Sequence, residues 1–371
     1  MKYYLIAGEA SGDLHGANLI KALKEIDPDA VFRFWGGDKM LAQGGTLVKH
    51  YKDLAFMGFW EVAKHLRTIF KNLSFCKEDI RAFEPDVIVY IDYPGFNMRI
   101  AQWAKQEGYI NHYYISPQIW AWKENRIHKI KRDIHQLYCI LPFEKEYYEK
   151  KHRHAVQYVG NPLVEVVAAA LAEKEDFIGE HNLDDKRPIV ALLPGSRKQE
   201  ILKMMPVFLD VATHFPKYQF VVAAAPGLDL SWYNQFSLAE NITIVSGATY
   251  PLLKHAEAAL VTSGTATLET ALFGVPQMVC YKSSWISFAI AKRVIRLSYV
   301  SLVNLILDQK VVEELLQDEC NVDRIKKELS ILFTPEKRKQ IKNDYTRLRT
   351  QLGEVSASRT TALQIVQSVQ D

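Results

Sequence analysis

Acidic side chains stand at the ends of apolar segments in this sequence, where they are positioned to do chemistry. Asp92 follows the apolar run 87–91, and the aromatic residues Tyr93 and Phe96 come soon after it. A carboxylate in such a place is partly desolvated and can take a proton from a hydroxyl nucleophile. Asp92 is therefore the candidate general base. The alternative is a turn or helix-capping role ahead of Pro94.

Residues 193–197 have the composition of an anion site. Gly195 and Ser196 precede a helical pattern, and Arg197 stands beside them. Backbone N–H groups, the helix dipole and a guanidinium together favour a bound diphosphate. A surface arginine after a turn is the alternative.

Hydroxyl side chains and a glycine gather further along the chain. Ser263, Gly264, Thr265 and Thr267 open a predicted helix, where their donors can reach phosphate oxygens. Glu269 follows one helical turn after Thr265 and can bind a vicinal diol such as a ribose. The pattern predicts a nucleotide site, and a capping box that uses Glu269 as an ordinary helix acid is the alternative.

The first loop, residues 8–13, lies between a predicted strand and a predicted helix. It is not GxGxxG, because an acidic residue stands where a pyrophosphate-binding loop needs bare backbone, and this argues against a dinucleotide. Glu9 or Asp13 could accept hydrogen bonds from sugar hydroxyls. The alternative is a tight turn in which Asp13 caps the helix beginning at Leu14.

Metal-binding and cofactor-binding patterns are missing from the sequence. It contains no Walker A segment, no HExxH, no DxD suited to Mg²⁺-bound diphosphate and no GxSxG. We therefore expect an enzyme that uses neither a metal nor a cofactor. The four cysteines are far apart and predict buried thiols in a reducing compartment: Cys76, Cys139, Cys280 and Cys320.

An aromatic, apolar stretch with interleaved cations begins at Leu54 and could contact lipid. Lys64, Arg67 and Lys71 supply the positive charge. The candidate lipid-contacting residues are Phe56, Met57, Phe59, Trp60, Ile69 and Phe70. Ordinary core packing of an amphipathic helix is the alternative. A second basic and apolar segment covers 285–299.

The elements that must position these residues alternate between strand and helix. Apolar strands, each followed by a polar or Gly/Pro loop, are expected at 3–7, 31–35, 87–91, 111–115, 189–193, 219–225, 242–245, 259–262 and 277–280. Continuous apolar strands separated by helices predict parallel sheets covered on both faces. We expect two doubly wound, Rossmann-like α/β domains facing across a cleft, with ligands at the carboxyl ends of the strands.

Length and composition agree with two domains. The chain has 371 residues, 48% of them apolar, which is enough for two cores. We expect an N-terminal domain at 1–172, a C-terminal domain at 187–334, and a helical tail at 335–371 that could pack back on an N-terminal domain. The net charge of +3 gives no field for non-specific nucleic-acid binding, so nucleic acid is not an expected partner. With no bilayer-length apolar run, we expect a cytoplasmic protein that touches a membrane peripherally.

Seven segments in chain order resemble the lipid-A-disaccharide synthase family. They are GEASGD at 8–13, IDYP with FN at 91–97, YISPQIWAW at 114–122, LPFE at 141–144, LLPGSR at 192–197, SGTATLE at 263–269 and YVSLVN at 299–304. The resemblance extends over most of the chain, and the SPxxWAW stretch is its most specific part.

The resemblance implies a GT-B, inverting glycosyltransferase. It would join UDP-2,3-diacylglucosamine to 2,3-diacylglucosamine 1-phosphate, giving a β-1,6-linked disaccharide 1-phosphate and UDP. In such an enzyme Asp92 is the base, and Glu9 and Ser11 lie on the acceptor side of the cleft. Arg197, the 263–269 loop and Asn304 line the nucleotide side. The partners would be the two acylated sugars and the inner membrane, with a homodimer left open.

Two positions depart from the family pattern. Gly95 replaces a residue that is often acidic, which removes a possible partner of Asp92, and Asn161 stands where histidine is common. Two other functions stay open at this point. One is a UDP-sugar epimerase on the same fold, and the other is a non-enzymatic protein that binds nucleotide sugars.

Overall fold

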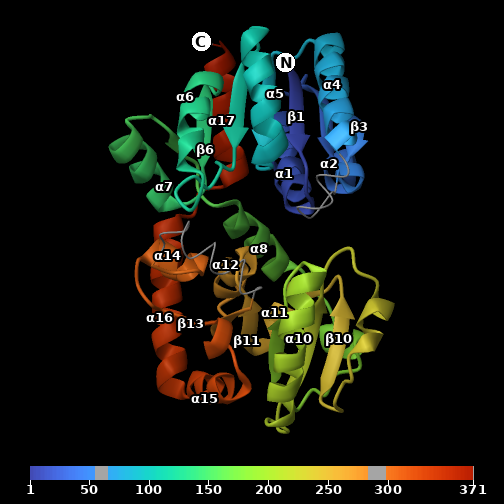
Figure 1. Ribbon diagram of the computed structural model, residues 1–371, viewed down its shortest axis with the longest axis vertical. Coiled ribbons are helices and arrows are strands. Elements are labelled where there is room, and N and C mark those ends of the chain that lie inside the picture. The colour runs from blue at the N-terminus through green and yellow to red at the C-terminus, as the bar shows by residue number, and fades with distance from the viewer. Residues whose placement is uncertain (55–65, 283–297, 371) are drawn as a thin grey trace. The chain divides into compact units, whose positions relative to one another are not determined.

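The computed structural model describes residues 1–54, 66–282 and 298–370, which form two α/β units (Figure 1). The first unit consists of Met1–Pro162 and Glu354–Asp371, and the second of Leu163–Gly353. The first boundary was expected at residue 172, ten residues later. Helix α8 (Pro162–Ala172) belongs to the second unit because its C-terminal end is held there. The Lys254 ammonium donates to the carbonyls of Ala170 (3.2 Å) and Glu173 (2.7 Å).

The first unit contains a parallel seven-stranded sheet. Its strands are β1 (Lys2–Ala7), β2 (Val31–Gly36), β3 (Thr46–His50), β4 (Val87–Ile91), β5 (Asn111–Tyr114), β6 (Gln136–Cys139) and β7 (Gln157–Tyr158). The order is β3-β2-β1-β4-β5-β6-β7. The direction of winding changes between β1 and β4, where Ala7 pairs with Ile91. This is the switch point at which open α/β sheets bind their ligands.

Helices cover both faces of this sheet. They are α1 (Ala10–Ile26), α2 (Asp38–Ala42), α4 (Leu66–Phe83), α5 (Pro94–Gln106), α6 (Ile127–Asp133), α7 (Pro142–Glu146) and α17 (Ala357–Gln370). One hydrophobic core lies under α1 and α17, and a second lies under α4, α5 and α6. The central strands β1 and β4 are almost entirely apolar because both of their faces are buried in this way.

The second unit has a parallel six-stranded sheet of order β10-β9-β8-β11-β12-β13. The strands are β8 (Ile189–Leu193), β9 (Gln219–Ala224), β10 (Ile242–Ser246), β11 (Ala256–Thr262), β12 (Gln277–Tyr281) and β13 (Glu313–Leu316). Besides α8, its helices are α9 (Phe177–Glu180), α10 (Lys198–Thr213), α11 (Thr249–His255), α12 (Thr265–Leu272), α14 (Leu302–Leu307), α15 (Val322–Leu332) and α16 (Pro335–Leu352). The switch point lies between β8 and β11, where Leu193 pairs with Val261.

The C-terminal tail divides between the units. Helix α16 stays in the second unit, where the Tyr345 hydroxyl donates to the Val275 carbonyl (3.2 Å). Helix α17 belongs to the first unit and packs beside α1. Only the last helix therefore returns to the first unit. Where the chain re-enters, Gly160 (φ 91°) lies so close to Val355 that a Cβ would sit 2.9 Å from the Val355 carbonyl oxygen.

Two further expectations concern the chain as a whole. All four cysteines are buried and free. Within the residues that the structure describes, no helix combines the length and the apolar character needed to cross a bilayer.

Candidate active site

Asp92 lies in a strained turn between β4 and α5. Its φ is 47° and that of Tyr93 is 50°, so two successive non-glycine residues occupy the left-handed region. Three hydrogen bonds hold the Asp92 backbone in this conformation. Its N–H donates to the Tyr114 carbonyl (3.1 Å), and its carbonyl accepts from the Tyr113 hydroxyl (2.6 Å) and the Asn97 amide (2.7 Å). The turn directs the side chain of Asp92 to the carboxyl edge of the sheet.

The β1 loop approaches Asp92 closely because Gly8 has no side chain. Gly8 follows Ala7, the partner of Ile91, and a Cβ on Gly8 would lie 2.3 Å from the Tyr93 ring. Only glycine lets the Tyr93 ring cover this loop. Glu9 comes next, exposed and at the first turn of α1, where it makes no side-chain cap.

The surroundings raise the proton affinity of Asp92. Burial, and then the charge of Glu9, raise the pKa of Asp92 to about 6, while the backbone N–H of Tyr93 opposes the shift. A base is most effective when its pKa lies near the working pH. Asp92 is thus ionised at neutral pH and still basic enough to accept a proton from a hydroxyl.

The other acidic residue of the first loop has a structural role. Asp13 lies inside α1 and its carboxylate accepts from the backbone N–H groups of Gly37 (2.7 Å), Met40 (3.0 Å) and Lys39 (3.1 Å). It therefore caps α2 and not its own helix, which begins at Ala10. Ser11, like Glu9, is exposed at the carboxyl end of β1.

The two departures from the family pattern lie in different surroundings. Gly95 is exposed, and a Cβ there would meet no atom within 4 Å, so the position next to the Asp92 turn has room for a side chain. Asn161 is buried and its amide donates to the Ile140 carbonyl (3.1 Å), which anchors the end of the first unit's main segment.

The loop after β5 is anchored by a buried carboxylate that sequence reasoning missed. Glu144 is 1% exposed, and one of its oxygens accepts from Ser116 Oγ (2.9 Å) and Trp120 Nε1 (2.9 Å). The other accepts from the backbone N–H groups of Leu141 (3.0 Å) and Ile140 (3.2 Å). Glu144 fixes the loop 116–122 to α7. The available signal was Glu144 standing three residues after Leu141, the spacing of a capping box.

In the second unit, the predicted anion site lies in the loop after β8. Gly195 has φ 115°, and Ser196 and Arg197 lead into α10. The side chain of Arg197 is 68% exposed and lies 3.6 Å from Glu200 Oε1. Glu200 also accepts from the Ser196 N–H (3.3 Å), so a carboxylate occupies this donor in the free protein. Sequence reasoning missed Glu200, although it stands three residues after Arg197, the N-cap of α10.

The neighbouring loop after β11 mixes free and structural hydroxyls. Thr265 is exposed, whereas Thr267 is fully buried, donating to the Gly264 carbonyl (2.8 Å) and accepting from the Leu302 N–H (3.3 Å). The half-buried Ser263 donates a long hydrogen bond to the Val300 carbonyl (3.4 Å), and its hydroxyl has no other partner among the residues that the structure describes. Thr265, Ser263 and the backbone at Gly264 are therefore the groups available to a ligand.

Glu269 is held by a tyrosine. Its Oε1 accepts from the Tyr250 hydroxyl (2.6 Å). Burial raises the pKa of Glu269, and the hydrogen bond from Tyr250 opposes this. A half-buried carboxylate with one oxygen fixed has the geometry to accept from a diol.

Asn304 is saturated by protein groups. Its amide donates to the Val312 carbonyl (2.9 Å) and Glu314 (2.8 Å), and its Oδ1 accepts from the N–H groups of Val311 (2.8 Å) and Val312 (3.0 Å). Glu314 also accepts from the Ser301 N–H (2.9 Å). Asn304 and Glu314 therefore position the start of α14, and Glu314 is a third residue that sequence reasoning missed.

The expected lipid-contacting residues divide into three groups. Phe56, Met57, Phe59 and Trp60 lie outside the described residues, as does most of the segment 285–299. Ile69 packs against the core under α4, which agrees with the alternative of ordinary core packing by an amphipathic helix. Phe70, its neighbour, is 61% exposed.

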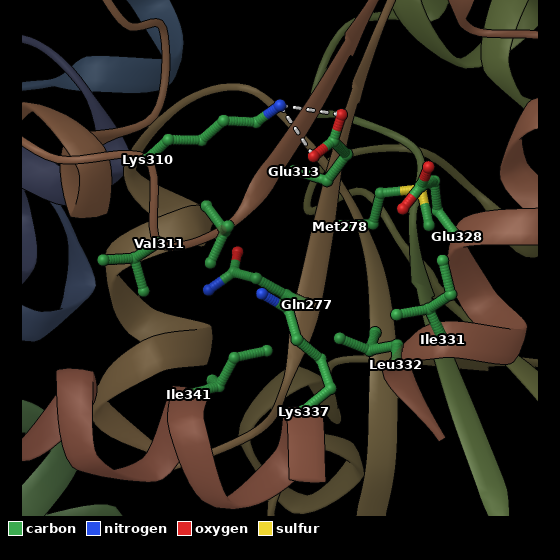
Figure 2. A pocket seen from close by; sticks show the side chains of 11 residues that line it. Gln277, Met278, Lys310, Val311, Glu313, Glu328, Ile331, Leu332, Lys337 and Ile341 are labelled. Atoms are coloured by element: carbon green, nitrogen blue, oxygen red, sulfur yellow. Dashed lines mark hydrogen bonds and ion pairs between the residues drawn. The ribbon is translucent and has the colours of Figure 1, made fainter. Parts of the chain in front are cut away.

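A cavity of about 300 Å³ lies away from these loops (Figure 2). It opens at the amino ends of β12 and β13, beside Gln277 and Glu313, and Lys310 pairs with Glu313 across its rim (2.8 Å). The predicted site residues lie at the opposite, carboxyl ends of the strands. Among residues 1–54, 66–282 and 298–370, no cluster of three or more His, Cys, Asp or Glu side chains is arranged to hold a metal.

Two doubly wound parallel sheets, each with polar loops at its switch point, give the chain the GT-B fold. Solved structures share this fold. A UDP-GlcNAc 2-epimerase from Neisseria meningitidis bound to UDP-GlcNAc has a TM-score of 0.71 at 11% identity, covering 99% of this chain and 100% of its own. The glycotransferase of kitacinnamycin has a TM-score of 0.66 at 12% identity, covering 99% of both chains.

The chain belongs to the lipid-A-disaccharide synthetase family, whose model matches residues 3–369. Lipid-A-disaccharide synthase from Syntrophus aciditrophicus is 38% identical over 367 residues, covering 97% of this chain and 95% of that protein. The Geobacter metallireducens enzyme is 36% identical, with 96% and 94% covered. The Coxiella burnetii (strain Dugway) enzyme is 37% identical, with 96% of both covered. Family membership favours the glycosyltransferase over the epimerase and the non-enzymatic binder.

Proposed function

We propose that this chain is a lipid-A-disaccharide synthase. It transfers 2,3-diacylglucosamine from its UDP derivative to 2,3-diacylglucosamine 1-phosphate, giving a β-1,6-linked disaccharide 1-phosphate and UDP. The observation that carries this proposal is the family match over residues 3–369, which includes every loop described above. The position and pKa of Asp92 support it chemically.

Asp92 acts as the general base of a single, inverting displacement. Its carboxylate takes the proton of the acceptor's 6-hydroxyl as that oxygen attacks the anomeric carbon of the donor. The new bond from oxygen to carbon forms as the bond from carbon to the diphosphate breaks. The electron pair leaves with UDP, and the configuration at the anomeric carbon inverts.

The second unit binds the donor and stabilises the leaving group. Arg197 and the backbone N–H groups at Gly195 and Ser196 carry the diphosphate, and Glu269 binds the ribose. This assignment requires the Glu200 carboxylate to release the Ser196 N–H when the diphosphate arrives, because two anions cannot share one donor. Charge on the leaving UDP is met by a guanidinium and fixed dipoles, so we propose that the reaction needs no metal.

Peripheral contact with the inner membrane supplies the acylated substrates. Phe70 is exposed on α4, and the exposed cations Arg67 and Lys71 flank it. An exposed aromatic side chain among cations favours an anionic bilayer surface. The chain works from the cytoplasmic side in this proposal.

One experiment separates this function from its two competitors. Purified protein is incubated with UDP-2,3-diacylglucosamine, with and without 2,3-diacylglucosamine 1-phosphate, and UDP is measured together with the donor sugar. A transferase releases UDP only when the acceptor is present. An epimerase changes the donor sugar without acceptor, and a regulatory binder does neither. Either of the last two results would overturn the proposal.

A further inference from the structure

An exposed tryptophan in the first unit lies between two cations. Trp122 is 43% exposed, although most tryptophans are largely buried. Lys123 Nζ lies 4.2 Å from the centre of a Trp122 ring, and the Arg126 guanidinium carbon lies 5.3 Å from it. Lys123 has φ 54°, in the left-handed region, so the chain departs from a relaxed conformation where it places this side chain.

The two cations lack a counter-charge. Across the described residues, neither Lys123 nor Arg126 forms an ion pair. The nearest acid in sequence, Glu124, is engaged by Lys151 (2.7 Å) and His152 (3.2 Å). Burial, and then the charge of Arg126, lower the pKa of Lys123. Two positive groups held together without an acid form a local field that attracts an anion.

This cationic pair belongs to the same edge of the sheet as Asp92. Tyr114, the last residue of β5, pairs with Ile91 and accepts the Asp92 N–H, and the loop that carries Trp122 starts directly after it. Burial raises the pKa of the Tyr113 phenol, the Asp92 charge raises it further, and the Arg126 charge opposes both. Arg126 and Asp92 therefore both act on the hydroxyl that holds the Asp92 backbone.

The loop is fixed before any ligand arrives. Glu144 binds Ser116 and Trp120, and the Tyr148 hydroxyl donates to the Pro117 carbonyl (3.1 Å). Two buried side chains, those of Glu144 and Tyr148, thus hold the segment from which Trp122 and Lys123 extend. A preorganised cationic pair binds with little loss of side-chain entropy.

We propose that Lys123 and Arg126 bind the phosphate monoester at carbon 1 of the acceptor sugar, with the Trp122 ring against the sugar. The identity of this acceptor rests on the proposed function. In a hexosamine 1-phosphate, carbon 6 and the phosphate are attached on either side of the ring oxygen. A base at the 6-hydroxyl therefore demands a phosphate site about one sugar ring away, and the neighbouring β5 loop supplies it.

Phosphate also occurs in the headgroups of anionic lipids, so the experiment must distinguish the two sources. The double variant Lys123→Ala with Arg126→Ala is compared with Lys129→Ala, which removes an exposed lysine from the following helix. Binding is measured by titration with a water-soluble, short-chain 2,3-diacylglucosamine 1-phosphate and with its dephosphorylated counterpart. Lipid binding is measured by co-sedimentation with phosphatidylglycerol and with phosphatidylcholine vesicles. Melting temperatures establish that each variant is folded.

The double variant should bind the phosphorylated sugar about 10- to 100-fold more weakly, as expected when charge-assisted hydrogen bonds are lost. Binding of the dephosphorylated sugar and of both vesicles should match that of the Lys129→Ala control. Unchanged affinity for the phosphorylated sugar overturns the proposal. A loss confined to phosphatidylglycerol vesicles also overturns it and assigns the pair to lipid headgroups. Because these titrations need no turnover, they keep their meaning even if the wild-type protein releases no UDP and the proposed function fails.

Discussion

The Tyr113 hydroxyl donates a 2.6 Å hydrogen bond to the backbone carbonyl of Asp92, and not to its carboxylate. The phenol therefore holds the strained backbone and leaves the carboxylate oxygens for chemistry. Asn97 bonds the same carbonyl (2.7 Å). The orientation of Asp92 is therefore fixed by Tyr113 on β5 and Asn97 on α5.

Tyr113→Phe removes one of these two bonds and should lower kcat by about 3- to 10-fold, because a single hydrogen bond contributes about 0.5 to 1.5 kcal/mol. KM for the acceptor should stay unchanged, since binding groups are untouched. Tyr90→Phe is the matched control, because that hydroxyl is also buried and bonds Asn111 (2.9 Å). Equal kcat losses in the two variants would show that Tyr113 acts on general stability only.

Asp92→Asn should lower turnover by about 10²- to 10⁴-fold and leave UDP affinity unchanged, because the amide keeps the shape and loses the basic oxygen. Steady-state rates and calorimetry with UDP measure the two effects. Asp29→Asn, which changes an exposed acid at the opposite edge of the sheet, is the control. A variant that keeps more than about a third of the wild-type kcat would make Asp92 a turn residue, with the base elsewhere, first at Glu9.

The pH profile should report the raised pKa of Asp92. Activity needs the ionised carboxylate, so kcat/KM for the acceptor should fall tenfold per pH unit below about pH 6. Glu9→Gln should move this limb to lower pH, because the Glu9 charge helps to raise the pKa of Asp92. An acid limb that stays in place in Glu9→Gln would exclude this coupling.

Glu269→Ala and Arg197→Ala should each weaken UDP binding by roughly 1.5 to 3 kcal/mol, the value of a charge-assisted hydrogen bond. Calorimetry can separate their targets. Glu269→Ala should reduce the affinity difference between UDP and its 2′,3′-dideoxy analogue, whereas Arg197→Ala should reduce the difference between UDP and uridine. Unchanged UDP affinity in both variants would remove the proposed nucleotide site.

EDTA should leave the rate unchanged, and a strict requirement for Mg²⁺ would contradict the metal-free mechanism.

Phe70→Ser and Ile69→Ser form a matched pair for the lipid role of α4. Phe70 is 61% exposed, so its replacement should reduce co-sedimentation with anionic vesicles and leave the melting temperature unchanged. Ile69 packs against the core, so its replacement should lower the melting temperature, with vesicle binding normal per folded molecule. Normal vesicle binding by Phe70→Ser would direct the search for lipid contacts to the segment 285–299.

The parallel sheets could be predicted because central strands such as β4 and β8 are apolar at every position, which is typical of a doubly covered sheet. The same reasoning placed Asp92 and Arg197 at strand ends. What local sequence could not supply was the partner of each polar group. In the sequence, Thr267 and Asn304 have the side chains of ligand-binding residues. Only the fold shows that Thr267 accepts from the Leu302 N–H and that Asn304 donates to the Val312 carbonyl.

Other differences arise from contacts distant in sequence. The boundary at Pro162 depends on Lys254, which reaches α8 from a helix more than eighty residues later. Ile69 and Phe70 are both apolar, and neighbours in sequence reveal nothing about which one faces the core. Composition therefore predicts which segments are buried, and the fold decides which of their side chains are free.

The return of α17 to the first unit has a consequence for how this protein is made. The second unit is one continuous segment, so its folding does not wait for α17. The first unit does wait, because its α1 face needs residues 354–371. Residues of α1 and α17 belong to the same hydrophobic core, so this core stays incomplete on the nascent chain until α17 emerges. The N-terminal half is thus the last part to be completed, and it is the half in which a chaperone or a premature stop codon should have the greater effect.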